Sequence, residues 1–452
     1  MYTSYTIILK EKDKDLKDYC SKYCQEAKLF KNAVIFRLRQ LYFAWIKDYQ
    51  DLSEHGKEVL KEFETTNNSY TPISKSKMFP SYNQFERMFR NTYNPDFYNS
   101  LPMQCNQQII KEGLNDFKSY LKARKKYEQD PSSFTGKPRF PKYAKSSEVS
   151  FDITNQDAVI YGNELKLPKT KIKLNLGALD IKDTMKLKEV TIKPFYDTYK
   201  VCLSFKDTSK DNEPIEIDDP NRVLGIDLGV DNIITTSNNC GLSPFVIKGN
   251  EIKSRNQWYN KLLAKYTSKL RNSTKQDSKY TSKRLNKLHM YRSNYVNDQY
   301  NKIAFYIIDY CQDNDIGTIV VGLNKQWKSE IKLRKADKQN FIEISHTVLI
   351  KKIKTMAERL SINVIEQEES YTSKASFLDH DEIPSYDSDI SLAYTFNGKR
   401  IKRGLYKTKD GILINVDVNG ASNILKKAIP HAFDEIQDFD YLIRTVYVVK
   451  IN

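Results

Sequence analysis

The segment VLGIDLG, residues 223–229, places a carboxylate inside an otherwise apolar strand. An isolated carboxylate is costly to bury, so Asp227 must find partners or reach an opening where it meets water or a cation. A second acidic residue, Asp417, stands in INVDVNGASNIL, where a strand or loop enters the last helix. The local alternative is that it only caps that helix, and Asn419 and Asn423 are either polar support or capping and surface groups.

Acidic residues from distant parts of a chain are the groups that a nuclease metal site requires. Hard divalent cations bind carboxylate oxygens, and a pair of them clamps the attacking and leaving oxygens of a phosphodiester. If Asp227 and Asp417 converge at one end of a sheet, we expect them to form part of such a site.

The composition favours a polyanionic partner. The 452 residues include 73 Lys and Arg against 57 Asp and Glu, a net charge of +16, and 30 Tyr and 21 Phe lie among the cations. Nucleic acid is the first candidate, because phosphates attract cations and bases stack on aromatic rings, although a merely basic protein is the alternative. No run of apolar residues is long enough for a signal peptide or a membrane span, so we expect a cytoplasmic protein without a membrane partner.

The elements that must position these residues lie in three regions of the sequence with different hydrophobic patterns. Residues 2–9 have the pattern of a strand, and apolar residues then recur at helical spacing in several stretches up to residue 123. From 134 to 205 alternation with Gly and Pro predicts an antiparallel β domain, and the helices are an insertion if the first strand belongs to it. After an acidic linker at 211–222, strands alternate with helices, which predicts an α/β unit.

Several ordered motifs resemble a known family. GIDLGVDNIITTSN, RLNKLHMYRSNY, ESYTSKASF, GKRIKRGLYK and DVNGASNIL, with GKPRFPKY and LPMQCNQQI earlier, resemble landmarks of TnpB, the transposon-encoded OrfB family related to type V CRISPR effectors. The resemblance implies a multidomain α+β fold: a wedge-type β barrel with an inserted helical recognition region, then a RuvC (RNase H-like α/β) nuclease domain. It also implies an RNA-guided DNA endonuclease that uses two Mg²⁺ ions, with Mn²⁺ as a substitute, a guide RNA from the transposon end and double-stranded target DNA. The resemblance further implies a prokaryotic protein, and we expect a monomer.

The resemblance also implies domain boundaries. We expect the wedge domain to begin with a strand at 1–12 and to continue at 131–212, around a recognition insertion at 13–130. The nuclease domain is expected at 213–374, followed by a basic insert at 375–415 and by the final helix and tail at 416–452.

Two departures from the family pattern matter. The family has Glu at the end of the fourth strand of the nuclease domain, where this chain has Gly322. The following strand ends in EQEE, so Glu366, Glu368 or Glu369 is a candidate replacement. We favour Glu368 and Glu369, and the predicted catalytic and metal-binding set is Asp227, Glu368, Glu369 and Asp417. Because a regular strand alternates faces, at most one of the adjacent pair points to the metals, and a solvated acidic strand end is the alternative.

The second departure concerns zinc. The family commonly has two C-x-x-C pairs after TSK, but here Ala375 stands where the first cysteine would be, and no cysteine follows Cys311. A four-ligand site cannot be built from His380 alone, so we expect no structural zinc. The insert at 375–415 must then be held by packing or remain mobile.

Basic residues near these motifs are expected to contact phosphates, although a solvated helix face is the alternative for any single lysine. The predicted nucleic-acid-binding residues are Arg255, Lys261, Lys269, Arg271, Lys283, Arg284, Lys399, Arg400, Lys402 and Arg403. Two other functions stay open. Gly322 favours an RNA-guided DNA-binding protein or repressor without nuclease activity, and GIDLG also resembles the phosphate loop of actin-like ATPases, although only 15 Gly occur in the chain.

Overall fold

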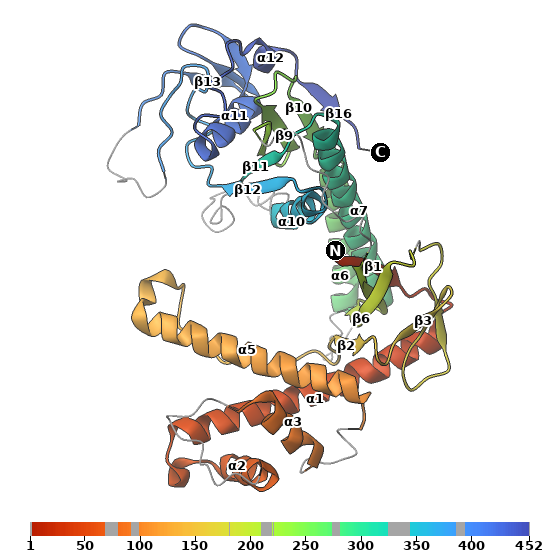
Figure 1. Cartoon of the computed structure of the whole chain (residues 1–452). Coiled ribbons are helices and arrows are strands. Elements are labelled where there is room, and N and C mark those ends of the chain that lie inside the picture. The colour runs from red at the N-terminus through yellow and green to blue at the C-terminus, as the bar shows by residue number, and fades with distance from the viewer. Residues whose placement is uncertain are drawn as a thin grey trace. The chain divides into compact units, whose positions relative to one another are not determined.

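The computed structural model describes residues 2–67, 80–91, 99–179, 181–208, 219, 221–273, 281–323, 344–385 and 394–451. The chain divides into two compact units, residues 1–210 and 211–452, and each combines helices with sheets (Figure 1). The expectation of a multidomain α+β protein is therefore confirmed. Most of the predicted linker, residues 211–218 and 220, lies outside the described residues. None of the described helices has the length and apolarity needed to cross a membrane.

The main sheet of the first unit is antiparallel, in the order β1-β7-β6-β2. Its strands are β1 (Tyr2–Ile8), β2 (Phe151–Thr154), β6 (Met185–Phe195) and β7 (Thr198–Asp207). A smaller sheet contains β3 (Val159–Tyr161), β4 (Glu164–Lys166) and β5 (Lys173–Asn175). Because β1 pairs with β7 along its whole length, the helices that follow β1 are inserted between strands of one sheet.

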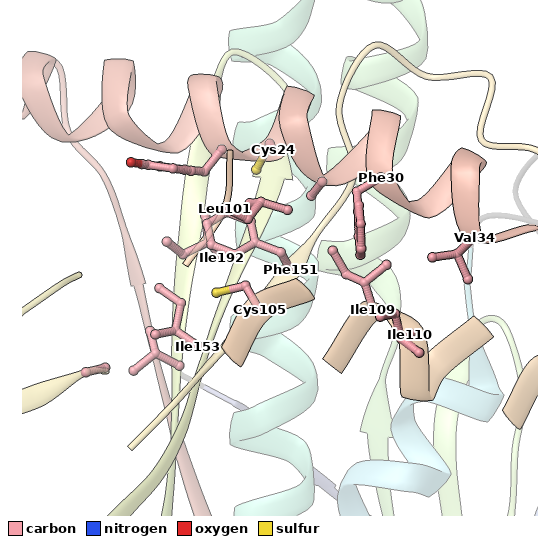
Figure 2. Packing of buried hydrophobic residues seen from close by; sticks show 14 of the residues in the cluster. Cys24, Phe30, Val34, Leu101, Cys105, Ile109, Ile110, Phe151, Ile153 and Ile192 are labelled. Atoms are coloured by element: carbon pink, nitrogen blue, oxygen red, sulfur yellow. The ribbon is translucent and has the colours of Figure 1, made fainter. Parts of the chain in front are cut away.

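The inserted helices share a core with that sheet. They are α1 (Lys14–Ile46), α2 (Glu54–Asn67), α3 (Tyr82–Asn91) and α5 (Met103–Gln129), with short 3₁₀ turns at Tyr49–Asp51 and Pro131–Ser133. Figure 2 shows Phe30 of α1 and Ile109 of α5 beside Phe151 and Ile192 of the strands, and all four belong to one buried cluster. The apolar faces of the amphipathic helices are thus buried against each other and against the sheet.

The second unit is built on a six-stranded sheet in the order β12-β11-β8-β9-β10-β16. The strands are β8 (Val223–Asp227), β9 (Asn232–Asn238), β10 (Phe245–Lys248), β11 (Thr318–Gly322), β12 (Asn363–Gln367) and β16 (Tyr447–Val449). Strands β8, β11 and β12 are mutually parallel, β9 is antiparallel to β8 and β10, and β16 is parallel to β10. We expected only a tail after the last helix, so the edge strand β16 is an addition to the prediction.

Helices cover both faces of this sheet (Figure 1). Leu224 and Ile226 of β8 point to the face that carries α7 (Lys283–Asp313) and α10 (His346–Ala357), which is followed by a 3₁₀ turn at Glu358–Leu360. Val223 points to the opposite face, where α11 (Val416–Ala428) packs. The helix α6 (Asn250–Ser273) pairs with α7. Asp227 shares the face of Val223, because alternate residues of a strand point the same way.

The described part of the insert at 375–415 is held by packing and by a small sheet. Phe377 lies 4.7 Å from Phe433 and 5.3 Å from Phe439, measured between ring centroids. The sheet contains β13 (Lys399–Lys402), β14 (Leu405–Lys407) and β15 (Leu413–Asn415), and the short helix α12 is Asp440–Ile443. Because β15 leads directly into α11, the insert is joined to the helix that carries Asp417.

Candidate active site

Two glycines bring α11 against the strand that carries Asp227. A Cβ atom at Gly225 would lie 2.7 Å from the backbone oxygen of Ala421, and one at Gly420 would lie 2.9 Å from Oδ2 of Asp227. Both distances are too short for a real Cβ. A side chain at Gly225 would push the helix backbone away, and one at Gly420 would displace the Asp227 carboxylate. Gly225, two residues before Asp227, thus allows the strand and the helix to approach each other closely.

Asp417 lies in the first turn of that helix but does not cap it. The N-cap is Asn415, whose Oδ1 accepts hydrogen bonds from the backbone N–H groups of Asp417, at 2.9 Å, and Val418, at 3.3 Å. The Asp417 carboxylate instead accepts a hydrogen bond of 2.6 Å from Nδ2 of Asn232, at the start of β9. Its side chain is therefore directed to the sheet, and the capping alternative for Asp417 is wrong.

Asp227 and Asp417 line the same cavity, which has a volume of about 570 Å³. Its wall combines the loop after β8 with strand ends and with the hairpin of β13 and β14. The other lining residues are Leu228, Gly229, Val230, Asp231, Asn232, Thr235, Lys248, Arg400, Arg403, Gly404 and Asn415. Two acidic groups that are 190 positions apart in the sequence thus face one opening, which three basic side chains also reach.

The three candidate glutamates point in different directions. Glu366, inside β12, forms an ion pair of 2.8 Å with Lys354 of α10 on the opposite face of the sheet. Glu368 forms an ion pair of 2.7 Å with Lys427 and accepts a hydrogen bond of 2.6 Å from the Ser370 N–H. Because these bonds hold Glu368 toward the end of α11, we correct the predicted set by removing it.

Glu369 is the glutamate that turns toward the end of β11. Its Oε2 lies 2.9 Å from the position that a Cβ atom of Gly322 would occupy, and the same position is 2.6 Å from Cδ1 of Ile424. The carboxylate therefore occupies space that a side chain at Gly322 would need. In the parallel register of β8 and β11, Gly225 pairs with Val320, which places Gly322 at the level of Asp227.

These carboxylates share a negatively charged environment. Burial raises the pKa of Asp227 well above its ordinary value, and the charges of Glu369 and Asp417 raise it further. Burial also raises the pKa of Glu369 to about 7, with a contribution from Glu368. Burial acts the same way on Glu368, but hydrogen bonds from Lys427 and Ser370 outweigh it and lower its pKa. No Lys or Arg among the described residues forms an ion pair with Asp227, Glu369 or Asp417.

Within the described ranges, no three His, Cys, Asp or Glu side chains stand close enough together to hold a metal ion as they are placed. Asp227, Glu369 and Asp417 are nevertheless near enough for the pKa of Asp227 to respond to both others. An ion that takes ligands from all three would require rotation of these side chains.

Two buried asparagines of α11 fix the loop that follows Glu369. Asn419 Oδ1 accepts a hydrogen bond of 3.0 Å from the Phe377 N–H, and its Nδ2 donates one of 2.8 Å to the Ala375 carbonyl. Asn423 donates bonds of 2.8 Å to the carbonyls of Thr372 and Ala375. Of the alternatives for these asparagines, polar support is therefore correct.

The predicted basic residues divide into two groups. Arg400 and Arg403 line the cavity, and their neighbours Lys399 and Lys402 are exposed on β13. Arg403 forms an ion pair with Asp231, which also binds Lys253 at 2.7 Å. The other predicted residues lie on α6 and α7 and do not line the cavity. These residues are Arg255, Lys261, Lys269, Arg271, Lys283 and Arg284.

Sequence reasoning missed Asn232 and Lys248. The Lys248 ammonium group donates a hydrogen bond of 2.8 Å to Oδ1 of Asn232, whose Nδ2 binds Asp417. Both residues lie at strand ends, and only the sheet order β8-β9-β10 brings them to the cavity. The signal that could have identified them is their position: each is a polar residue at the end of a strand that follows the strand of Asp227.

Comparisons with known proteins address the same region. Residues 208–328 match the family model OrfB_IS605, described as a probable transposase. No curated protein matches the chain. Similar solved structures include the Cas12f1–sgRNA–target DNA complex, with 13% identity, a TM-score of 0.49 and coverage of 91% of this chain and 82% of that chain. The CRISPR-Cas12f ternary complex has 13% identity, a TM-score of 0.34 and coverage of 92% and 85%. The family match includes Asp227 and confirms the resemblance found in the motifs: the chain is TnpB-like, and its residues 208–328 are similar to the OrfB_IS605 family.

Proposed function

We propose that this chain is an RNA-guided DNA endonuclease of transposon origin, whose second unit is a RuvC-type, RNase H-like nuclease domain. The observation that carries the proposal is one cavity lined by Asp227 and Asp417 together with Lys248, Arg400 and Arg403. Acidic groups beside basic groups suit a metal-dependent reaction at a phosphate, because the cations bind phosphate oxygens and the carboxylates bind divalent ions. The OrfB_IS605 match supports the transposon origin.

The donor atoms fit Mg²⁺. Asp227, Glu369 and Asp417 offer carboxylate oxygens, which hard divalent ions prefer, and no cysteine or histidine lines the cavity within the described residues. Bound Mg²⁺ ions would polarise the scissile phosphate and lower the pKa of the attacking water. The three carboxylates would hold them, and Asn232 would orient Asp417 through its hydrogen bond of 2.6 Å.

The basic side chains would position the DNA strand. A guanidinium group binds phosphate through two parallel hydrogen bonds, and Arg400 and Arg403 reach the cavity from an exposed hairpin. Arg403 would exchange Asp231 for a phosphate when the strand enters. None of these contacts reads a base, so the sequence of the target would be selected by pairing with the guide RNA.

Glu369 supports an active nuclease over an inactive DNA-binding protein. The inactive alternative rests on Gly322, which leaves the end of β11 without a carboxylate. The Glu369 carboxylate from the neighbouring chain segment lies at that place, 2.9 Å from a Cβ built on Gly322.

The proposal is tested with the purified chain and the RNA that copurifies with it. Sequencing that RNA identifies the guide, and DNA complementary to it, flanked by a randomised segment, is then offered as substrate. We expect cleavage with Mg²⁺ or Mn²⁺ and none with EDTA. Guided binding without cleavage in either metal would favour the repressor alternative, and the absence of bound RNA would contradict the proposal as a whole.

Asn232→Ala is expected to slow cleavage about 10- to 100-fold, because groups that orient metal ligands have effects of this size. The substitution removes the hydrogen bond to Asp417 and the acceptor of Lys248 but no carboxylate. Single-turnover cleavage over a Mg²⁺ titration measures the loss, which should shrink at high Mg²⁺. Asn301→Ala, which alters an asparagine of α7 outside the cavity, is the control; equal rates for wild type and Asn232→Ala would exclude this positioning role.

A further inference from the structure

A second cavity, of about 600 Å³, lies at the N-terminal end of α6. It is lined by Asn250, Glu251, Ser254, Arg255, Trp258 and Tyr295. Trp258 and the nearby Tyr291 of α7 are each 44% exposed, and their ring centroids are 5.7 Å apart. Aromatic rings exposed together beside a polar cavity offer flat surfaces on which another ring can stack.

Three aromatic rings surround the Arg255 side chain at this second cavity. Its guanidinium carbon lies 4.7 Å from the ring centroid of Tyr295, 5.5 Å from that of Tyr291 and 5.9 Å from that of Trp258. No ion pair of Arg255 occurs among the described residues. Cation–π contacts fix the guanidinium without neutralising its charge, so it can still bind an anion.

The second cavity adjoins the candidate active site along the chain. Lys248 lines the first cavity and Asn250 lines the second, and two residues span at most about 7 Å. Lys253, in the first turn of α6, binds Asp231 of the first cavity at 2.7 Å. The helix α6, which begins at the second cavity, is strongly basic, with six Lys and Arg against one Glu in Asn250–Ser273. This positive charge would attract a polyanionic strand that leaves the first cavity.

We propose that Arg255, Trp258, Tyr291 and Tyr295, the α6 platform, bind an unpaired nucleotide of the DNA strand whose phosphate occupies the candidate active site. The base stacks on Trp258, Arg255 pairs with the adjoining phosphate, and Asn250 and Glu251 face the polar edge of the base. The α6 platform rests on the proposed function for the identity of the strand. A base stacked in a duplex has no free face, so the platform selects DNA whose strands have been separated.

The test measures binding in EDTA, so it needs no cleavage. The full chain with its copurified RNA is titrated into a fluorescein-labelled single-stranded oligodeoxynucleotide, and into the same strand with abasic sites in place of bases. Trp258→Ala is expected to weaken binding of the base-bearing strand about tenfold, and Trp258→Phe less than about threefold. Binding of the abasic strand should not change. Phe305→Ala, which removes a 63% exposed ring of α7 outside this cavity, is the matched control and should bind both strands as wild type does.

Two results would overturn the platform. Either Trp258→Ala binds the base-bearing strand as tightly as wild type, or it loses the abasic strand to the same degree, which would indicate a phosphate contact or a folding defect. Failure of the proposed function has a different signature. If the chain shows the Trp258-dependent preference for bases but does not cut DNA in Mg²⁺, the platform stands and the nuclease proposal falls.

Discussion

Asp227→Asn is expected to abolish DNA cleavage while guided binding of the target persists. Asparagine keeps the size of the side chain but removes the charge that would bind Mg²⁺. Losing such a ligand removes several kcal/mol of transition-state stabilisation, which is at least about a thousandfold in rate. Single-turnover cleavage and a gel-shift assay with the same guided complex and target measure the two properties separately.

The fold should tolerate this substitution. The pKa of Asp227 is raised in the folded protein, so its ionised form is disfavoured there and destabilises the fold as the pH rises above the ordinary pKa of Asp. At neutral pH the asparagine variant should therefore unfold at the same temperature as wild type or at a higher one. Asp298→Asn, which alters an exposed acid on α7, is the matched control for cleavage. Wild-type cleavage by Asp227→Asn would refute the site, and joint loss of binding and thermal stability would indicate a folding defect instead.

Glu369→Gln is expected to lower cleavage about a hundredfold or more, because it removes one of the three proposed carboxylate ligands. Glu366→Gln is the matched control. It removes a glutamate three residues away whose partly exposed ion pair with Lys354 is worth about 0–1 kcal/mol. The same single-turnover assay ranks the two variants. Equal rates for Glu369→Gln and wild type would show that Glu369 does not replace the missing glutamate.

Gly322→Ala also tests whether Glu369 takes the place of the missing glutamate, but it leaves Glu369 itself unchanged. Its Cβ would lie 2.6 Å from Cδ1 of Ile424 and 2.9 Å from Oε2 of Glu369, and Ile424 is fully buried. The methyl group should therefore displace the Glu369 carboxylate and lower cleavage without removing any charged group. Unchanged cleavage in Gly322→Ala would mean that the position of Glu369 beside β11 is not needed for catalysis.

The two aspartates could be found from the sequence because Asp227 breaks a local rule and Asp417 lies within a family motif. Asp227 is charged within an apolar strand, and Asp417 stands at a strand-to-helix junction. The choice between Glu368 and Glu369 could not be made in the same way. Alternation of faces applies only inside a strand, and β12 ends at Gln367, before both residues. Lys427 of α11 decides the outcome by binding Glu368, a tertiary contact that strand periodicity does not encode.

Two other parts of the structure could not be predicted because they depend on the order of strands in the sheet. Asn232 and Lys248 are unremarkable polar residues until β9 and β10 are placed beside β8. The edge strand β16 has only three residues, and Tyr447 and Val448 are exposed. Neither an alternation of apolar and polar residues nor a long apolar run therefore predicts it. The order of helices and strands, in contrast, follows from hydrophobic periodicity, which depends only on near neighbours in the sequence.

The position of α11 in the chain has a consequence for protein synthesis. This helix supplies Asp417, fixes the loop after Glu369 through two asparagines and binds Glu368 through Lys427. The hydrogen bond between Asn232 and Asp417 joins residues 185 positions apart. At about 5–20 residues per second, a ribosome that has made β8 and β9 needs roughly 10–40 seconds more to reach α11. A nascent polypeptide therefore lacks Asp417 and the contacts that fix the loop after Glu369 until translation is nearly past this helix. Under the proposed function, a message truncated before α11 would encode a product that cannot cut DNA.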